Sequence, residues 1–499
     1  MGRETYRTIP AGVGGRTGTL VPEPAPEPGN SIVTALARGM RYGSVVDGVV
    51  EAGLCSSCGV CAGLCPTSAL RMKALEVGDL QPVMVGQCLS GCSACLHVCP
   101  FAGGVHDPRP MNEELYASGR AGPNRFQENI GWHLACIVGN VGSPAGAPGG
   151  LATWCLERLL RKGLVDRICA VRFDPQSNGA LFRFTTIDDP KDVEKTSGSV
   201  YHPVEISSVV RKALAAPHIR WALIGVPCLC GAVRNLRELD TRVPFVFGLA
   251  CGMCQNTMYT EFLLAKSGVR VGDVSRLDCR ETPVTQPVPS LAGKACGETG
   301  MADGPVHYAG TTSPLGRHGH FRLNACDYCM DVFAETSDVA FMDAWMPEYA
   351  GEREGMSLVV VRSAAIWEIL QAGRSEGRLE FREIHSNLAA ISQAAHVRRK
   401  QELIRLRCKS APIRGSGRPP RLSERLDWVL QRLVQRYSRR AWTLIGRKCG
   451  PSAYWLAMSP LAVPQFVVDQ YLRLKSLATR AIKRLAPKKI CSIWPGAAL

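Results

Sequence analysis

CSSCGVCAGLCP, residues 55–66, places four cysteines at intervals of three, three and four residues and closes the series with a proline. CLSGCSACLHVCP, residues 88–100, repeats this pattern with one extra residue in the first interval. Three closely spaced thiolates can wrap one face of an iron–sulfur cube, and the fourth, before the proline, reaches across to a second cube. The spacing therefore predicts two cubane iron–sulfur sites.

The ligands of these two sites divide into crossed sets. The first [4Fe–4S] cluster takes Cys55, Cys58, Cys61 and Cys99. The second takes Cys88, Cys92, Cys95 and Cys65. A zinc site is disfavoured because zinc sites usually combine two separated C-x2–4-C pairs. Two such clusters predict a protein that passes single electrons.

Composition favours metal ligation over disulfide bonding. The chain has 22 cysteines among 499 residues, and its first residues, MGRETYRTIPAGVGG, lack the apolar core of an export signal. We therefore expect a protein of the reducing cytoplasm, with attachment to the inner membrane face as a further option. Hydrophobic residues make up 46% and charged residues 20%, which is typical of a globular enzyme. No apolar run is long enough to predict a membrane-spanning helix.

The chain is long enough for several folded units, and its composition changes along its length. We predict a disordered, Pro- and Gly-rich leader (1–40), a two-cluster ferredoxin-like module of βαββαβ order (41–110), an α/β domain (111–395) and a basic helical extension (396–499). The fold class is therefore α/β, or α+β for the whole chain.

The α/β prediction rests on alternating patterns. WALIGV (221–226), VPFVFGLAC (243–251), SDVAFMDAW (337–345) and SLVVVR (357–362) are strand-like. LATWCLERLLRKG and TMYTEFLLAKSG are helix-like, and each ends in a glycine. Strands that alternate with helices indicate an α/β domain.

Five motifs occur in the order expected for one family. They are SPAGAPGGLAT (143–153), GVPCLCGAVRNL (225–236), GLACGMCQN (248–256), ACDYCMDVFAETSDVAFMDAW (325–345) and GMSLVVVR (355–362). Following two ferredoxin-type runs, this series resembles the family of coenzyme F420 hydrogenase/dehydrogenase beta subunits. Within that family, the chain is similar to the bacterial members linked to polysaccharide biosynthesis.

The resemblance implies an α/β domain that binds FAD. The residues that it implies for FAD binding are Ser143, Gly149, Gly150, Thr153, Pro227, Arg280 and Asp343. The glycine pair before a helix suits a turn whose amides approach a flavin ring or phosphate, and the alternative is an ordinary strand-to-helix turn. For Arg280, the alternative to a role in FAD binding is that it is an ordinary solvated arginine on the surface. Met342 stands where the family has glycine, which weakens the case for a close backbone approach beside Asp343.

Four more cysteines are candidate ligands of a third [4Fe–4S] cluster beside the flavin. They are Cys228, Cys251, Cys326 and Cys329, with Cys230 and Cys254 as additional candidates. The first two follow apolar runs, at strand ends where α/β sheets place ligands. The other two form a C-x2-C pair, which is also compatible with structural zinc or with reduced thiols.

The implied activity is that of an oxidoreductase. It exchanges hydride between FAD and a two-electron partner such as coenzyme F420, and the clusters exchange single electrons with ferredoxin or another redox protein. One alternative is a ferredoxin-dependent reductase of an organic C=C or C=O bond, and another is a non-catalytic electron-relay subunit. The candidate proton donors are His202, His307, His318 and His320, and no spacing selects among them.

The formal charge of +16 comes from the C-terminal segment. From His396 onward, 23 Lys/Arg stand against 4 Asp/Glu, so the positive charge of the whole chain is not evidence about the active site. Ser423 is the predicted N-cap of a helix there. The apolar face of that helix consists of Leu426, Val429, Leu433 and Tyr437. The segment has three candidate contacts, namely its own domain, an anionic membrane surface and an acidic protein, and no motif supports nucleic-acid binding.

Overall fold

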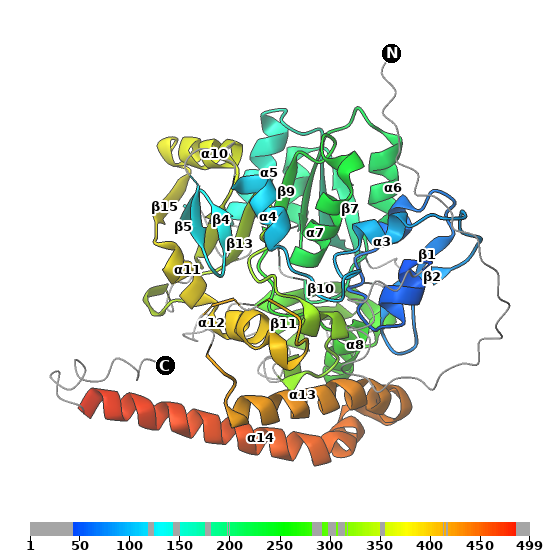
Figure 1. The fold of residues 1–499 in the computed structure, drawn as a ribbon, viewed down its shortest axis with the longest axis vertical. Coiled ribbons are helices and arrows are strands. Elements are labelled where there is room, and N and C mark those ends of the chain that lie inside the picture. The colour runs from blue at the N-terminus through cyan, green and yellow to red at the C-terminus, as the bar shows by residue number, and fades with distance from the viewer. Residues whose placement is uncertain are drawn as a thin grey trace, which may run out of the picture.

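The computed structural model describes most of the chain. The described residues are 43–117, 124–142, 150–174, 181–196, 198, 200–281, 292–297, 306–307, 315–316, 318–349, 355–412, 414–415 and 418–485. The leader predicted for residues 1–40 lies outside them. Figure 1 shows a large central sheet, a cysteine-rich block at one end of it, and two long C-terminal helices along one side.

The centre of the molecule is an eight-stranded mixed sheet, which confirms the α/β class. Its strands, in spatial order, are β15 (Leu379–Glu383), β5 (Ala135–Val141), β14 (Ser357–Val361), β13 (Val339–Asp343), β9 (Phe245–Leu249), β8 (Trp221–Gly225), β6 (Arg167–Phe173) and β7 (Phe182–Ile187). Strands β5, β13, β9, β8 and β6 run in one direction, and β14, β15 and β7 run in the other. The four runs predicted as strands form β8, β9, β13 and β14.

Side chains alternate between the two faces of this sheet, as the two-residue period of a strand requires. In β14, Val359 and Val361 pack under α5 (Leu151–Arg161) and α10 (Ala364–Ser375). Leu358 and Val360 point to the opposite face. That face is covered by α11 (Ser386–Ser392) and α12 (Ala394–Val397) near one edge, and by α6 (Ser207–Ala215) and α7 (Pro227–Asn235) near the other.

The cysteine-rich block packs against α6 and α7 and shares their hydrophobic core. Its elements are η1 (Val46–Val50), α2 (Val60–Leu64), β1 (Leu70–Ala74), β2 (Leu80–Met84) and α3 (Ala94–Val98), and α4 (Arg109–Tyr116) follows. The predicted βαββαβ order is wrong, because the described residues of this block hold a single antiparallel hairpin, β1–β2. The segment before the first cysteine run is helical, since Val45 and Val49, four residues apart, are buried together.

Two smaller sheets complete the β structure. They are β3 (Arg125–Gln127) with β4 (Gly131–His133), and β10 (Val274–Glu281) with β11 (Ala292–Gly297) and β12 (Val306–His307).

Two C-terminal helices pack on α8 (Thr257–Lys266) through an aromatic core. They are α13 (Leu422–Ala441), continued by the π-helix η9 (Trp442–Gly446), and α14 (Arg447–Leu485). Gly450 has a φ of 86° inside α14, and this non-helical residue marks the kink where the chain turns back along α13. No helix in the described part of the chain is long and apolar enough to cross a membrane.

The first turn of α13 differs from the prediction. Its N-cap is Arg421 rather than Ser423, and the backbone N–H of Arg421 donates to the carboxylate of Glu424 at 2.7 Å. Glu424 is fixed by ion pairs with Arg398 and Arg418. A serine is a common N-cap, but here the carboxylate at the third helical position supplies the capping contact.

Candidate redox site

The carboxyl ends of the parallel strands lie at one edge of the large sheet. Gly225, Leu249 and Asp343 are the last residues of three neighbouring strands, β8, β9 and β13. Cys228 follows the first of these strands and Cys251 the second. Open α/β sheets bind their ligands at this edge, so the geometry brings two of the predicted cysteines to a ligand-binding position.

The four cysteines of the predicted third site come together here from distant parts of the chain. Burial raises the pKa of Cys228 well above its ordinary value, and nearby Cys329, Cys251 and Cys326 raise it further. All four side chains are therefore within electrostatic reach of one another. Their role as cluster ligands stays a prediction.

The two additional candidate ligands, Cys254 and Cys230, lie in different surroundings. The backbone N–H of Cys254 donates to Cys326 Sγ at 3.2 Å, so Cys254 lies at the cysteine group. Cys230 instead lies in the hydrophobic core, where its thiol donates to the carbonyl oxygens of Gly225 and Phe247. The two thiols point to different sides because Cys228 and Cys230 lie two positions apart on helix α7, slightly more than half a turn.

The basic C-terminal segment reaches this cysteine group. The ammonium of Lys400 donates to the carbonyl oxygen of Cys251 at 3.1 Å and to that of Asp331, and the residue is only 2% exposed. Arg399 donates to the carbonyl oxygen of Gly252. A Cβ on Gly252 would clash with the ring of His396, so the glycine permits this close approach. Residues of the basic segment therefore contact the cysteine group directly.

Two cations act on the thiol of Cys329. Burial alone would raise its pKa, but Lys400 and His106 outweigh burial and lower the pKa of Cys329 to about 7. His106 Nδ1 lies 3.4 Å from Cys329 Sγ. A parallel bridge between the two residues, in which His106 N donates to Tyr328 O, joins the end of the cysteine-rich block to this group.

The four cysteines of the first ferredoxin-type set also lie close enough to act on one another electrostatically. Burial raises the pKa of Cys99, and Cys58 and Cys55 raise it further. Burial also raises the pKa of Cys61, with added contributions from Cys58, Cys55 and Cys99. The last cysteine of the second run thus lies with the first three of the first run.

The second set lines a cavity. Desolvation raises the pKa of the exposed Cys88, and Cys92 and Cys65 raise it further. Cys65, Cys88, Cys92 and Cys95 all line one small pocket that is partly open to solvent. Four soft sulfur donors around one pocket are the kind of ligand set that a [4Fe–4S] cluster takes.

The three sets form a series. Cys95 of the second set acts on Cys61 of the first, and Cys58 of the first acts on Cys228 at the sheet edge. In the described residues, no three His, Cys, Asp or Glu side chains converge to hold a single metal ion. A cubane distributes its four thiolates over four irons instead of gathering them around one.

The residues implied for FAD binding fall mostly at the same edge. Gly150, with a φ of 61°, precedes α5, and Thr153 lies in the first turn of that helix. Pro227 begins α7, directly after β8, and Asp343 ends β13. The structure describes only the backbone of Arg280, within β10. Two further residues of this set, Ser143 and Gly149, lie outside the described residues.

Exposed apolar side chains mark the strand ends. Val226 follows β8, Leu249 ends β9 and Trp345 follows β13, and all three are exposed. Val226 and Leu249 each lie near the end of a strand-like run, and that position is the only signal of them in the sequence. Exposed apolar side chains beside the ligand-binding edge of a sheet are suited to contact an aromatic ring system.

Two of the candidate proton donors lie in the protein core. His202 Nδ1 is 2.9 Å from Thr260 Oγ1. His320 Nδ1 is 2.5 Å from Tyr454 Oη, and burial lowers the pKa of His320 to about 3. The histidine in contact with Cys329 is His106, which no sequence spacing had identified.

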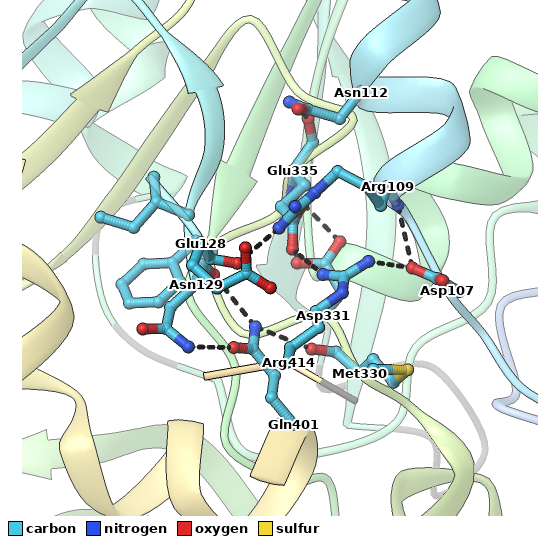
Figure 2. Close-up of polar contacts among 12 residues, drawn as sticks. Asp107, Arg109, Asn112, Glu128, Asn129, Met330, Asp331, Glu335, Gln401 and Arg414 are labelled. Atoms are coloured by element: carbon cyan, nitrogen blue, oxygen red, sulfur yellow. Dashed lines mark hydrogen bonds and ion pairs between the residues drawn. The ribbon is translucent and has the colours of Figure 1, made fainter. Parts of the chain in front are cut away.

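A buried polar network supports the loop that carries Cys329 (Figure 2). The carboxylate of Glu335 pairs with Arg109 at 3.0 Å and with Arg414 at 2.7 Å. Arg414 also pairs with Asp107. The network thus joins the end of the cysteine-rich block, the loop before β13 and the basic C-terminal segment.

A helix-covered sheet with a series of thiolate sets leading to its ligand-binding edge defines the class of this protein, which is an oxidoreductase. Two family models match the chain. They are the N-terminal part of the coenzyme F420 hydrogenase/dehydrogenase beta subunit, over residues 139–211, and its C terminus, over residues 219–387. The chain belongs to this family, as the five motifs had implied.

Curated relatives agree with this assignment. The chain is 25% identical over 310 residues to a subunit of the F(420)H(2) dehydrogenase of Methanosarcina mazei, an alignment that covers 60% of this chain and 79% of the relative. It is 22% identical over 355 residues to the coenzyme F420-dependent sulfite reductase of Methanocaldococcus jannaschii, covering 67% of this chain and 48% of that relative. The chain therefore spans about half the length of the sulfite reductase.

Among solved structures, the chain is similar to one in a xenon-derivatised F420-reducing [NiFe] hydrogenase complex from Methanosarcina barkeri. The TM-score is 0.44 at 16% identity, over 60% of this chain and 98% of that chain. The cysteine runs at 55–99 and helices α13 and α14 lie outside the ranges of the two family models.

Proposed function

We propose that this chain is an iron–sulfur flavoprotein that exchanges hydride with coenzyme F420 or a similar two-electron partner at the carboxyl edge of the large sheet. The observation that supports this most strongly is the series of three cysteine sets between a partly open cavity and that edge. When bound, the clusters carry single electrons, and FAD converts between single electrons and hydride.

The outer and inner cysteine sets have different roles in the proposed electron transfer. The outer set, which includes the exposed Cys88, is accessible to a one-electron carrier such as ferredoxin. Arg71 and Lys73 are exposed on the neighbouring strand β1 and favour a carrier with an acidic surface. The inner sets hold their clusters away from water, with the group of Cys228 and Cys251 nearest the flavin.

The remaining residues hold the flavin and the hydride partner. The N-terminus of α5, after Gly150, favours a phosphate group because its free amides carry partial positive charge. Val226, Leu249 and Trp345 offer an apolar surface to the ring system. Pro227, Asp343 and Arg280, with Ser143 and Gly149, which precede α5 in the sequence, complete the proposed FAD site.

The proposal is tested by anaerobic purification and by quantitation of iron and flavin. We expect about twelve irons and one FAD per chain, whereas about eight irons would restrict the clusters to the two ferredoxin-type sets. The protein should oxidise reduced coenzyme F420 with a viologen as electron acceptor. Iron without flavin would favour the electron-relay subunit. Flavin with no reaction towards coenzyme F420 would favour the reductase of an organic C=C or C=O bond.

Replacement of Lys400 is expected to change the potential of the third cluster. Lys400→Met removes a buried positive charge beside Cys251 and Cys329, so the reduced, more negative state loses stabilisation. One charge at roughly 7 Å in a medium of effective dielectric about 20 is worth about 2 kcal/mol, on the order of 100 mV for one electron. The potential should therefore fall by that order in a redox titration monitored by electron paramagnetic resonance.

Lys409→Met is the matched control, because Lys409 is exposed and its removal changes the net charge equally. The control should leave the potential almost unchanged, since solvent screens an exposed charge. Equal shifts in both variants would mean that Lys400 acts only through net charge.

A further inference from the structure

Helix α13 is oriented with its polar face towards the protein. Gln431 accepts a hydrogen bond from Arg322 at 2.8 Å, and Gln435 donates to the carbonyl oxygen of Arg322 at 3.2 Å. Ser438 Oγ accepts the backbone N–H of Phe321 at 3.0 Å. The predicted apolar face of this helix therefore points away from the domain.

The opposite face of α13 carries an exposed row that we call the outer apolar stripe. Its members are Leu422, Leu426, Val429, Leu433 and Tyr437. They recur at intervals of three and four residues, so they share one side of the helix. Leu422 is 73% exposed and Leu426 is 51% exposed. Exposed apolar side chains continue in η9 and α14 with Leu444, Ile445, Leu456, Val463 and Val467.

Basic residues border the stripe. Arg425 lies three residues after Leu422, and Arg436 lies three residues after Leu433, so both are neighbours of stripe residues on the helix surface. Both arginines are exposed. Residues 421–448 contain 8 Lys/Arg against 2 Asp/Glu. Of the two acids, Glu424 is held by arginines, and Asp427 accepts a hydrogen bond from Gln431.

We propose that the outer apolar stripe of α13, with the neighbouring surface of η9 and α14, binds an anionic lipid membrane. A long apolar row bordered by arginines is the pattern of helices that lie in the plane of a membrane interface. Helices α13 and α14 together form one side of the molecule, and α14 runs along the outer edge of that side (Figure 1). Acidic headgroups complement the arginines, while the apolar side chains enter the boundary of the acyl chains.

A second copy of the chain fits this surface less well. A symmetric contact through the stripe would bring the arginine borders of two copies together, because both partners use the same patch. Like charges at such a contact repel one another, whereas the acidic headgroups of a membrane attract them.

The test is co-sedimentation of the full-length protein with vesicles of phosphatidylcholine, with and without phosphatidylglycerol. We expect binding to the anionic vesicles, weakened by high salt. Leu426→Gln/Leu433→Gln should lower the partition coefficient by about tenfold or more, since both side chains would lose their apolar burial. Arg425→Gln/Arg436→Gln should lower it by roughly tenfold on anionic vesicles only.

The matched control is Leu388→Gln/Ile391→Gln, which changes two exposed apolar residues of α11. This control should bind vesicles as the unmodified protein does. Failure of the unmodified protein to bind anionic vesicles at low salt would overturn the proposal. So would unchanged binding of the Leu426/Leu433 variant. A dimer that this variant abolishes, without any binding to vesicles, would identify a second copy as the true occupant.

Discussion

The double variant Cys65→Ala/Cys88→Ala is expected to lose about four irons per chain, no more than either single variant loses. The reason is the crossed arrangement, in which Cys65 lies with Cys88 and Cys92 around the cavity while Cys99 lies with Cys55 and Cys58. Two ligands of one cluster are then removed, and the other cluster keeps all of its own. Iron analysis with electron paramagnetic resonance of the reduced protein measures the result.

Cys65→Ala/Cys99→Ala is the reference for this experiment, because it removes one ligand from each set and should cost about eight irons. An uncrossed arrangement predicts a different result for the first pair. Cys65 would then belong with Cys55, Cys58 and Cys61, and its combination with Cys88→Ala would cost about eight irons as well. Such a loss would refute the crossed assignment.

Glu335→Gln should destabilise the protein by about 3–5 kcal/mol, the usual cost of removing one partner from a buried ion pair. The carboxylate of Glu335 is fully buried between Arg109 and Arg414 (Figure 2). Glutamine keeps the shape of the side chain but leaves Arg414 with Asp107 as its remaining carboxylate and the Arg109 guanidinium with the carbonyl oxygen of Glu128. Denaturation in guanidinium chloride, followed by circular dichroism, measures the change in the first unfolding transition.

Asp166→Asn provides the comparison, because it breaks an ion pair with Arg220 at the surface. Exposed ion pairs of this kind contribute at most about 1 kcal/mol. If the two variants were equally stable, solvent would have to reach Glu335, and the network would not be the rigid support of the Cys329 loop.

The elements and the position of the site follow from local patterns. Apolar runs of strand length became β8, β9, β13 and β14, because these strands are buried on both faces of the sheet. Cys228 and Cys251 could be placed at the same edge from their positions directly after such runs. The spacing of the two N-terminal cysteine runs likewise predicts, from local sequence alone, which cysteines belong to the same set.

The remaining features depend on contacts between distant residues. Lys400 reaches Cys251 across 149 positions, and Arg414 reaches Asp107 across 307. Net charge could not reveal these contacts, because a count of arginines and lysines does not show which of them are buried. Likewise, the period of α13 shows that Leu426 and Leu433 share a face, but not whether this face points inward.

The residues that cover the Cys251 and Cys329 group are made long after the first cysteine runs. Lys400 leaves the ribosome about 300 residues after Cys99, a delay of roughly 15–60 s at 5–20 residues per second. On the proposed assignment, the two N-terminal sets are therefore synthesised well before the cation that lies against the third set in the folded protein. The cysteines of the outer end of the series are made first, and the contacts that complete its inner end are made last.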